Sequence, residues 1–234
     1  MAISHRGLHS RVPENSFSAF RLAMAAGAEA IELDVHASRD GTVYVHHDAD
    51  VVVPGGDDQP AGLPIAQLDS KAISSLRLAG DHVIPTLDDV LAEVAANAGL
   101  YIEIKATGIE AAVARCLRRH PSSIGECAVH SFDHRTVKAM LQLAPSVRTG
   151  VLQASYPIDS CGMMRAAGAQ DLWQRFDFID SALVTNVRAC GGRVIAWTVN
   201  DPGEWGRLTK MGVFGICTDK VDELVRWKRA ILSQ

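Results

Sequence analysis

Short apolar runs alternate with segments of helical period from one end of the chain to the other. Apolar runs of this length suit buried strands, whereas apolar positions that recur every three or four residues suit helices. This alternation predicts eight strands, at Ala2 to His5, Ala30 to Val35, Leu100 to Lys105, Cys127 to Phe132, Val147 to Leu152, Phe176 to Ile179, Arg193 to Val199 and Val213 to Thr218.

The intervening segments carry helix start and stop signals. Asn15 or Ser16 can cap the first helix, Asp133 precedes another, and Gly27 and Gly212 follow two of the helical segments. Helices are predicted at Ser16 to Ala26, Leu87 to Ala98, Ile109 to Arg119, His134 to Leu143, Ser181 to Cys190, Pro202 to Met211 and Val221 to Leu232.

Eight strands that alternate with helices predict an α/β fold, a single (β/α)8 barrel across residues 1–234. An open dinucleotide-binding sheet fits poorly, because no GxGxxG follows the first strand and "HRG" stands in its place. The run from Asp40 to Pro85 departs from the alternation. Its Gly/Pro-rich part predicts a small insertion, residues 49–85, after the second strand and over the barrel mouth.

Composition narrows the functional classes. With 47% hydrophobic and 21% charged residues, the 234-residue chain is of the globular type, and a net charge of -4 offers no footprint for nucleic acid or an anionic membrane. No apolar run reaches the length of a membrane span and the first residues do not resemble a signal peptide, so we expect a cytoplasmic protein without stable membrane association. The five scattered cysteines are expected to be reduced and mostly packed.

Three acidic residues interrupt otherwise apolar strands. Glu32 and Asp34 lie two residues apart in "AIELDV", and Glu103 lies in "LYIEIK". Strand alternation places Glu32 and Asp34 on one face, and functional groups of such barrels gather at the carboxyl ends of the strands. Three converging carboxylates suit a hard divalent cation, Mg²⁺ or Ca²⁺, better than zinc.

The alternative is that these acids only form ion pairs with the nearby cations, Arg6 and Lys105. For any single acid this alternative is the better interpretation, since an unpaired buried carboxylate is costly. The ion-pair alternative explains less well why three acids lie beside only two obvious cations.

Histidines supply the candidate proton carriers. His5 ends the first strand, and the adjacent His46 and His47 follow "TVYV". Because histidine titrates near neutrality, His5 and one of this pair can act as general acid and base. We expect the other histidines, including His9 and His130, to lie at the surface or to be satisfied hydrogen-bond partners.

From Ile3 to Asp219 the chain resembles the glycerophosphodiester phosphodiesterase family. The resemblance rests on an ordered series of words: "HRG", "PENSFSAF", "GAEAIELDV", "DGTVYVHHD", "IEIK", "SFD", "WTVN" and "GVFGICTD". It implies metal-dependent hydrolysis of a small-molecule glycerophosphodiester to glycerol 3-phosphate and an alcohol. The Arg-Thr-Thr-rich word that usually follows the HD motif is missing, so the resemblance does not specify the contacts with the alcohol.

The resemblance also implies roles for individual residues. It makes His5 and His47 the general acid and base, which decides against His46. It makes Glu32, Asp34 and Glu103 the ligands of one divalent cation. Arg6 and Lys105 correspond to phosphate-contacting cations, and Trp197 to the pocket wall.

Two other functions stay open. A lysophospholipase D or sphingomyelinase D type of activity needs an apolar groove or membrane-facing loop, for which "VVVPGG" is a faint candidate. A barrel that binds a phosphorylated ligand without turnover would lack part of the acid and histidine set. The sequence leaves open the alcohol, the choice of metal, which histidine is the acid, a homo-oligomer, and whether Glu14 braces Arg6 or favours the helix start.

Overall fold

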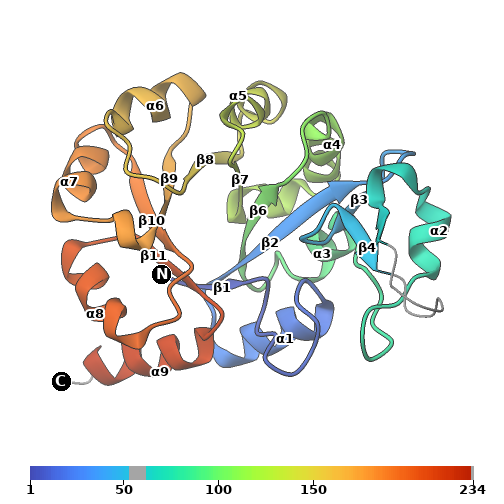
Figure 1. The fold of residues 1–234 in the computed structure, drawn as a ribbon, viewed down its shortest axis with the longest axis horizontal. Coiled ribbons are helices and arrows are strands. Elements are labelled where there is room, and N and C mark those ends of the chain that lie inside the picture. The colour runs from blue at the N-terminus through green and yellow to red at the C-terminus, as the bar shows by residue number, and fades with distance from the viewer. Residues whose placement is uncertain (53–61, 233–234) are drawn as a thin grey trace.

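Eight parallel strands form a closed ring in the computed structural model, which describes residues 1–52 and 62–232. β1 pairs with β2 on one side and with β11 on the other, so the barrel predicted from the sequence is confirmed. Figure 1 shows the helices around the central strands. The ring consists of β1 (Ala2–His5), β2 (Ala30–Ala37), β6 (Gly99–Ile104), β7 (Cys127–Ser131), β8 (Arg148–Gln153), β9 (Asp171–Arg175), β10 (Arg193–Trp197) and β11 (Gly215–Thr218).

The helices begin and end where local chemistry allows. Before α1, the Ser16 side chain accepts a hydrogen bond from the backbone N–H of Ala19, and Gly27 ends the helix with a left-handed φ of 92°. The helices are α1 (Phe17–Ala26), α3 (Leu87–Glu93), α4 (Glu110–Arg119), α5 (His134–Leu143), α6 (Ser160–Ala167), α7 (Ser181–Ala189), α8 (Pro202–Met211) and α9 (Val221–Leu232), with 3-10 turns η2 (Pro121–Glu126) and η3 (Phe176–Phe178).

The chain leaves the βα alternation after β2. β3 (Val43–Val45) pairs antiparallel with β2, and β4 (Asp50–Val52) pairs with β5 (Gly62–Pro64). They are followed by η1 (Ile65–Gln67) and α2 (Ser70–Ser75), which Figure 1 shows beside β3 at one side of the barrel. These elements and the segment between α2 and α3 share an apolar cluster: Tyr44, Val51, Ile65, Ile73 and Ile84.

Part of the predicted insertion, residues 53–61, lies outside the described residues, and so does most of "VVVPGG". The boundary at 49–85 and its position over the barrel mouth stay predictions, as does the single domain across 1–234.

Apolar side chains fill both sides of the ring. Ile3, Leu152, Trp173 and Ile195 belong to a cluster contributed by the barrel strands, while a larger cluster joins the strands to the helices. Among the residues that the structure describes, no helix combines the length and apolar character needed to cross a bilayer.

One predicted strand was wrong and one helix was not predicted. The sixth ring strand is Asp171–Arg175, and the segment predicted as that strand, Phe176 to Ile179, begins with a 3-10 turn. Two polar residues make the true strand look like a loop in the sequence. Asp171 and Gln174 are both buried, where Arg193 donates to Asp171 and the Gln174 amide nitrogen donates to the backbone carbonyl of Gln153. The sequence prediction also missed α6.

The expectation that all cysteines are reduced was also wrong. Cys161 in α6 and Cys190 at the end of α7 form a disulfide, whereas Cys116, Cys127 and Cys217 are free and buried. A disulfide is more typical of an oxidising compartment. The cytoplasmic location therefore stays a prediction.

Candidate functional site

A pocket of about 150 Å³ opens at the carboxyl ends of the barrel strands. The parallel register brings the predicted residues together there: His5 is paired with Glu32, and Asp34 with Glu103. Seven of the eight predicted residues line the pocket, namely His5, Arg6, Glu32, His47, Glu103, Lys105 and Trp197.

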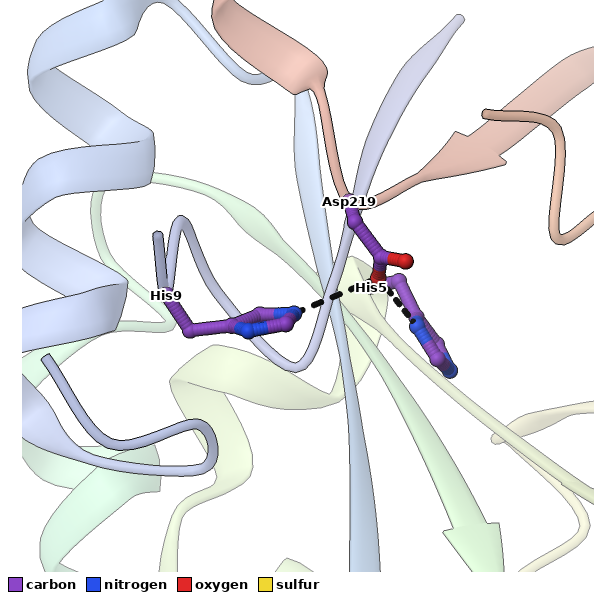
Figure 2. Close-up of side chains that lie close together, drawn as sticks. All are labelled: His5, His9 and Asp219. Carbon is purple, nitrogen blue, oxygen red and sulfur yellow. Dashed lines mark hydrogen bonds and ion pairs between the residues drawn. The ribbon is translucent and has the colours of Figure 1, made fainter. Parts of the chain in front are cut away.

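His5 is the last residue of β1, and its ring lies between two carboxylates. Nδ1 lies 2.7 Å from Oδ1 of Asp219, and Nε2 lies 3.9 Å from Oε2 of Glu32. Figure 2 marks the contact between His5 and Asp219 with a dashed line. Burial by itself would lower the pKa of His5, but the hydrogen bond to Asp219 and the charge of Glu32 outweigh it and raise the pKa. The ring can therefore hold a proton next to the pocket.

The chain turns sharply immediately after His5. Arg6 has a left-handed φ of 56°, which costs an L-residue about 1 kcal/mol, and Gly7 follows with a φ of 82°. A Cβ atom on Gly7 would lie 2.7 Å from the backbone carbonyl carbon of Ala19, so this position requires glycine. The turn lets two consecutive side chains, those of His5 and Arg6, reach the same pocket.

Arg6 is held by two acids. Its Nη1 donates to Oε1 of Glu14 at 2.9 Å, and its Nε lies 3.0 Å from Oδ2 of Asp34. The structure thus answers the question about Glu14, which braces Arg6. The guanidinium is held at the pocket by these acids.

Asp34 is fully buried beneath the pocket. Asn15 donates to its Oδ2 at 3.0 Å, while Nζ of Lys105 lies 3.5 Å from its Oδ1. Burial would raise the pKa of Asp34, but Arg6 and Lys105 outweigh it and hold the pKa below its usual value. Asp34 is therefore an ionised carboxylate among cations, as the ion-pair interpretation of the sequence expects.

Glu32 has a different environment, although its side chain is only 3% exposed. Its Oε2 is buried without a hydrogen-bond partner, and its Oε1 lies 3.7 Å from Nε2 of His130. Burial, reinforced by the charge of Asp34, raises the pKa of Glu32 well above its usual value. A positively charged partner would stabilise the buried carboxylate of Glu32, whose Oε2 has no hydrogen-bond partner.

Glu103 and Lys105 face the same pocket from β6 and the residue after it. Nζ of Lys105 lies 2.9 Å from Oε1 of Glu103, so this predicted ion pair is present. Burial would lower the pKa of Lys105, but Glu103 and Asp34 outweigh it and raise the pKa, which keeps the ammonium charged. A cation thus lies between two of the predicted metal ligands.

Of the two adjacent histidines, His47 lines the pocket. Its Nδ1 lies 2.8 Å from Oδ1 of Asp48, the neighbouring residue. Nε2 of His46 instead lies 3.3 Å from the backbone carbonyl oxygen of Asp50, and burial lowers the pKa of His46. His47 is thus the member of the pair that lies at the pocket, and its role as acid or base stays a prediction.

The sequence analysis did not assign two pocket neighbours to the site, and its expectation for His130 was wrong, because this ring is buried and its Nδ1 has no hydrogen-bond partner. His130 stacks on Trp173 with ring centroids 4.2 Å apart, and burial lowers its pKa to about 4. Asp219 follows β11 and holds His5. Both lie near the carboxyl end of a strand, so the rule that singled out Glu32 would have found them in "CAVHS" and "ICTD".

The described residues offer a donor set for a divalent cation. Ligand atoms of Glu32, Glu103 and His130 lie within 4.8 Å of one another. Glu32 Oε2 and Asp34 Oδ1 are buried oxygens without a hydrogen-bond partner, which is the condition that a bound cation would satisfy. The residues fit a cation.

Aromatic side chains form the apolar side of the pocket. Trp197 and Phe132 contact each other edge to face, with ring centroids 5.5 Å apart, and both line the pocket. Phe132 is 48% exposed. One wall is therefore apolar, while the floor carries the charged groups.

Comparison with known proteins points to one family. Residues 5–223 match the model of the Glycerophosphoryl diester phosphodiesterase family. A protein of Caldanaerobacter subterraneus subsp. tengcongensis named glycerophosphodiester phosphodiesterase is 30% identical over 239 residues, which cover 98% of each chain.

Solved structures share the fold. A glycerophosphodiester phosphodiesterase from Agrobacterium tumefaciens superposes with a TM-score of 0.82 at 25% identity, over 96% of this chain and 98% of the other. An Oleispira antarctica phosphodiesterase, solved in complex with the product sn-glycerol-3-phosphate, has a TM-score of 0.86 at 22% identity, over 99% of this chain and 96% of the other.

Proposed function

Because the chain belongs to the glycerophosphoryl diester phosphodiesterase family, and is thereby a phosphoric diester hydrolase, we propose that it hydrolyses glycerophosphodiesters to sn-glycerol 3-phosphate and an alcohol. The observation that carries this proposal is the convergence of seven predicted residues on one pocket. The product named for the Oleispira antarctica relative supports the choice of substrate.

In this proposal Glu32, Asp34 and Glu103 hold one divalent cation, Mg²⁺ or Ca²⁺. The support is that Glu32 and Asp34 each have a buried oxygen without a hydrogen-bond partner and that Glu103 lines the pocket. A bound cation supplies positive charge that polarises the phosphodiester. His130 is a further candidate ligand because its Nε2 approaches Glu32.

His5 and His47 carry the protons. Nε2 of His5 points toward the pocket floor at Glu32, while its Nδ1 is engaged by Asp219, so Nε2 is the nitrogen that can exchange a proton with a substrate. One histidine deprotonates the nucleophile, either water or the neighbouring glycerol hydroxyl, and the other protonates the leaving alcohol.

Arg6 and Lys105 bind the phosphate oxygens. Both are pocket-lining cations, and Arg6 offers a guanidinium that is already braced by Glu14. Trp197 shields one side of the substrate from water, together with Phe132. These contacts place negative charge where two fixed cations can stabilise it in the transition state.

The test is release of glycerol 3-phosphate from glycerophosphocholine, with and without a chelator. We expect release that stops with chelator and returns on addition of Mg²⁺ or Ca²⁺, and the better of the two identifies the metal. Release that is unaffected by chelator would contradict the metal dependence. Absence of release with either metal, under conditions where the protein is folded, would contradict the proposed activity.

A parallel assay with a lysophospholipid separates the lysophospholipase D alternative. The pocket lining includes the charged side chains of Arg6, Glu103 and Lys105, which suit a polar substrate better than an acyl chain. We therefore expect glycerophosphocholine to be cleaved with the higher kcat/KM.

The histidine that protonates the alcohol is identified by a substrate with an activated leaving group. Glycero-3-phospho-p-nitrophenol keeps the glycerol hydroxyl and releases p-nitrophenolate, which needs no proton. Replacement of the general acid by alanine should cost much less with this substrate than with glycerophosphocholine, whereas replacement of the base should cost about the same with both.

A further inference from the structure

Asp219, the residue after β11, holds His5 from the side that faces away from Glu32. We propose that Asp219 is a positioning residue, which fixes the orientation of the His5 ring and keeps the proton of the neutral ring on Nδ1, so that Nε2 is free to act in the pocket. The inference rests on the proposed function, in which His5 exchanges a proton with the substrate.

The geometry at Asp219 is that of a shared acceptor. Its Oδ1 lies 2.7 Å from Nδ1 of His5 and 3.2 Å from Nε2 of His9. Figure 2 marks both contacts with dashed lines. One carboxylate oxygen therefore contacts two rings, one at the end of β1 and one in the loop before α1. A carboxylate oxygen can accept both hydrogen bonds at once.

The carboxylate is itself held from its other side. Nδ2 of Asn200 donates to Oδ2 of Asp219 at 2.5 Å, and Oδ1 of Asn200 accepts from the backbone N–H of Asp219 at 2.9 Å. The hydroxyl of Thr218 donates to the same Asn200 oxygen. Asn200, in the loop after β10, therefore holds Asp219 independently of the two histidines.

These contacts determine which His5 nitrogen carries the proton. Burial would raise the pKa of Asp219, but the hydrogen bonds from His5 and His9 outweigh it and lower the pKa, so the carboxylate is ionised and can only accept. The neutral His5 ring must then be protonated at Nδ1. Its Nε2 carries the lone pair and lies on the side of Glu32.

An asparagine at this position could not take over the role. Its amide nitrogen would face either the donor group of Asn200 or the two histidine rings. In the second case His5 would have to accept at Nδ1, which moves the proton to Nε2. The isosteric variant Asp219→Asn is therefore expected to favour the wrong tautomer.

The experiment compares Asp219→Ala and Asp219→Asn with the wild type in the glycerophosphocholine assay. We expect kcat to fall by about tenfold to hundredfold in each, with KM within about threefold, because the substrate still binds. Asp222→Ala is the matched control. Asp222 lies three residues further along, pairs with Arg226 on the surface of α9, and its replacement should leave kcat unchanged.

A double variant distinguishes positioning from a general structural role. In the His5→Ala background, Asp219→Ala should cause no further loss of kcat, because Asp219 acts only through His5. A further loss as large as in the wild-type background would overturn the inference. So would a kcat within about threefold of wild type in Asp219→Ala.

The outcome for His5→Ala separates the two levels of argument. If His5→Ala loses turnover while the Asp219 variants keep it, the proposed function stands and the inference fails. If His5→Ala keeps near-native turnover, both fail. Should the Asp219 variants not fold, ¹⁵N chemical shifts of His5 in the wild type at alkaline pH decide: protonated Nδ1 supports the inference, and protonated Nε2 overturns it.

Discussion

Two buried acids at opposite ends of the barrel, Asp171 and Glu32, have contrasting partners. Asp171, 1% exposed at the start of β9, receives both Nε and Nη2 of Arg193 at 2.7 Å, while Arg148 approaches at 3.5 Å. Glu32, 3% exposed near the carboxyl ends, keeps one oxygen without a hydrogen-bond partner. The two acids are thus buried to a similar extent, but only Asp171 has a hydrogen bond to each of its carboxylate oxygens.

The surroundings reinforce the contrast. Arg193 donates to both oxygens of Asp171 and its guanidinium lies 3.8 Å from the ring centroid of Phe214, so the charges of this pair are matched at the amino-terminal end of the barrel. The carboxyl end instead combines the left-handed backbone at Arg6 with an oxygen of Glu32 that has no hydrogen-bond partner. Incomplete satisfaction of buried polar groups, rather than burial itself, marks the end where chemistry is expected.

The largest expected effect is at the carboxyl end. His5→Ala and His47→Ala should each lower turnover of a glycerophosphodiester by about a hundredfold or more, because each removes a positioned acid or base. His120→Gln is the control, because His120 caps the end of α4, pairs with Asp88 and does not line the pocket. Near-native kcat in both active-site variants would contradict the assignment.

Glu32→Gln tests whether that acid is kept for function. We expect turnover to fall by about a hundredfold, since the proposed metal site loses a charged ligand. The melting temperature of the metal-free protein should stay equal or rise, because a neutral amide no longer opposes burial beside Asp34. A marked loss of thermal stability in this variant would make Glu32 a structural residue.

Asp171→Asn should behave in the opposite way. It leaves the guanidinium of Arg193 without its anionic partner, and we expect the free energy of unfolding to fall by about 2 kcal/mol, less than for a completely buried pair. The kcat per folded molecule should not change. Urea unfolding measures the free energy and the turnover assay measures kcat. A lowered kcat would contradict the proposal that the amino-terminal end is structural and the carboxyl end functional.

The smallest expected effect is on how the stability of the protein depends on pH. The hydrogen bond to Asp219 outweighs burial and raises the pKa of His9 in the folded protein. The protonated His9 ring therefore stabilises the fold fully below pH 6.5, and this stabilisation is lost as the pH rises through the raised pKa. His9→Gln should therefore cost less than about 1 kcal/mol at pH 6, with the difference shrinking toward pH 9. A difference in melting temperature that grows with pH would contradict this.

The sequence predicted most of the barrel because the ring strands are apolar and short. It failed at β9, where Asp171 and Gln174 made a buried strand look like a loop, and at α6. It also missed the disulfide, since Cys161 and Cys190 are 29 residues apart and only the packing of α6 beside α7 brings them together. Pairing of distant polar groups has no local signal.

The candidate site divides in the same way. The sequence by itself determined which residues stand at strand ends, since periodicity and the order of the words place His5, Glu32 and Glu103 there. The tertiary structure alone decided their partners: Asp34 lies among cations, and Asp219, 214 residues from His5, holds its ring. The physical reason is that strand periodicity is a local property, whereas hydrogen bonding and desolvation depend on groups that only closure of the barrel brings into contact.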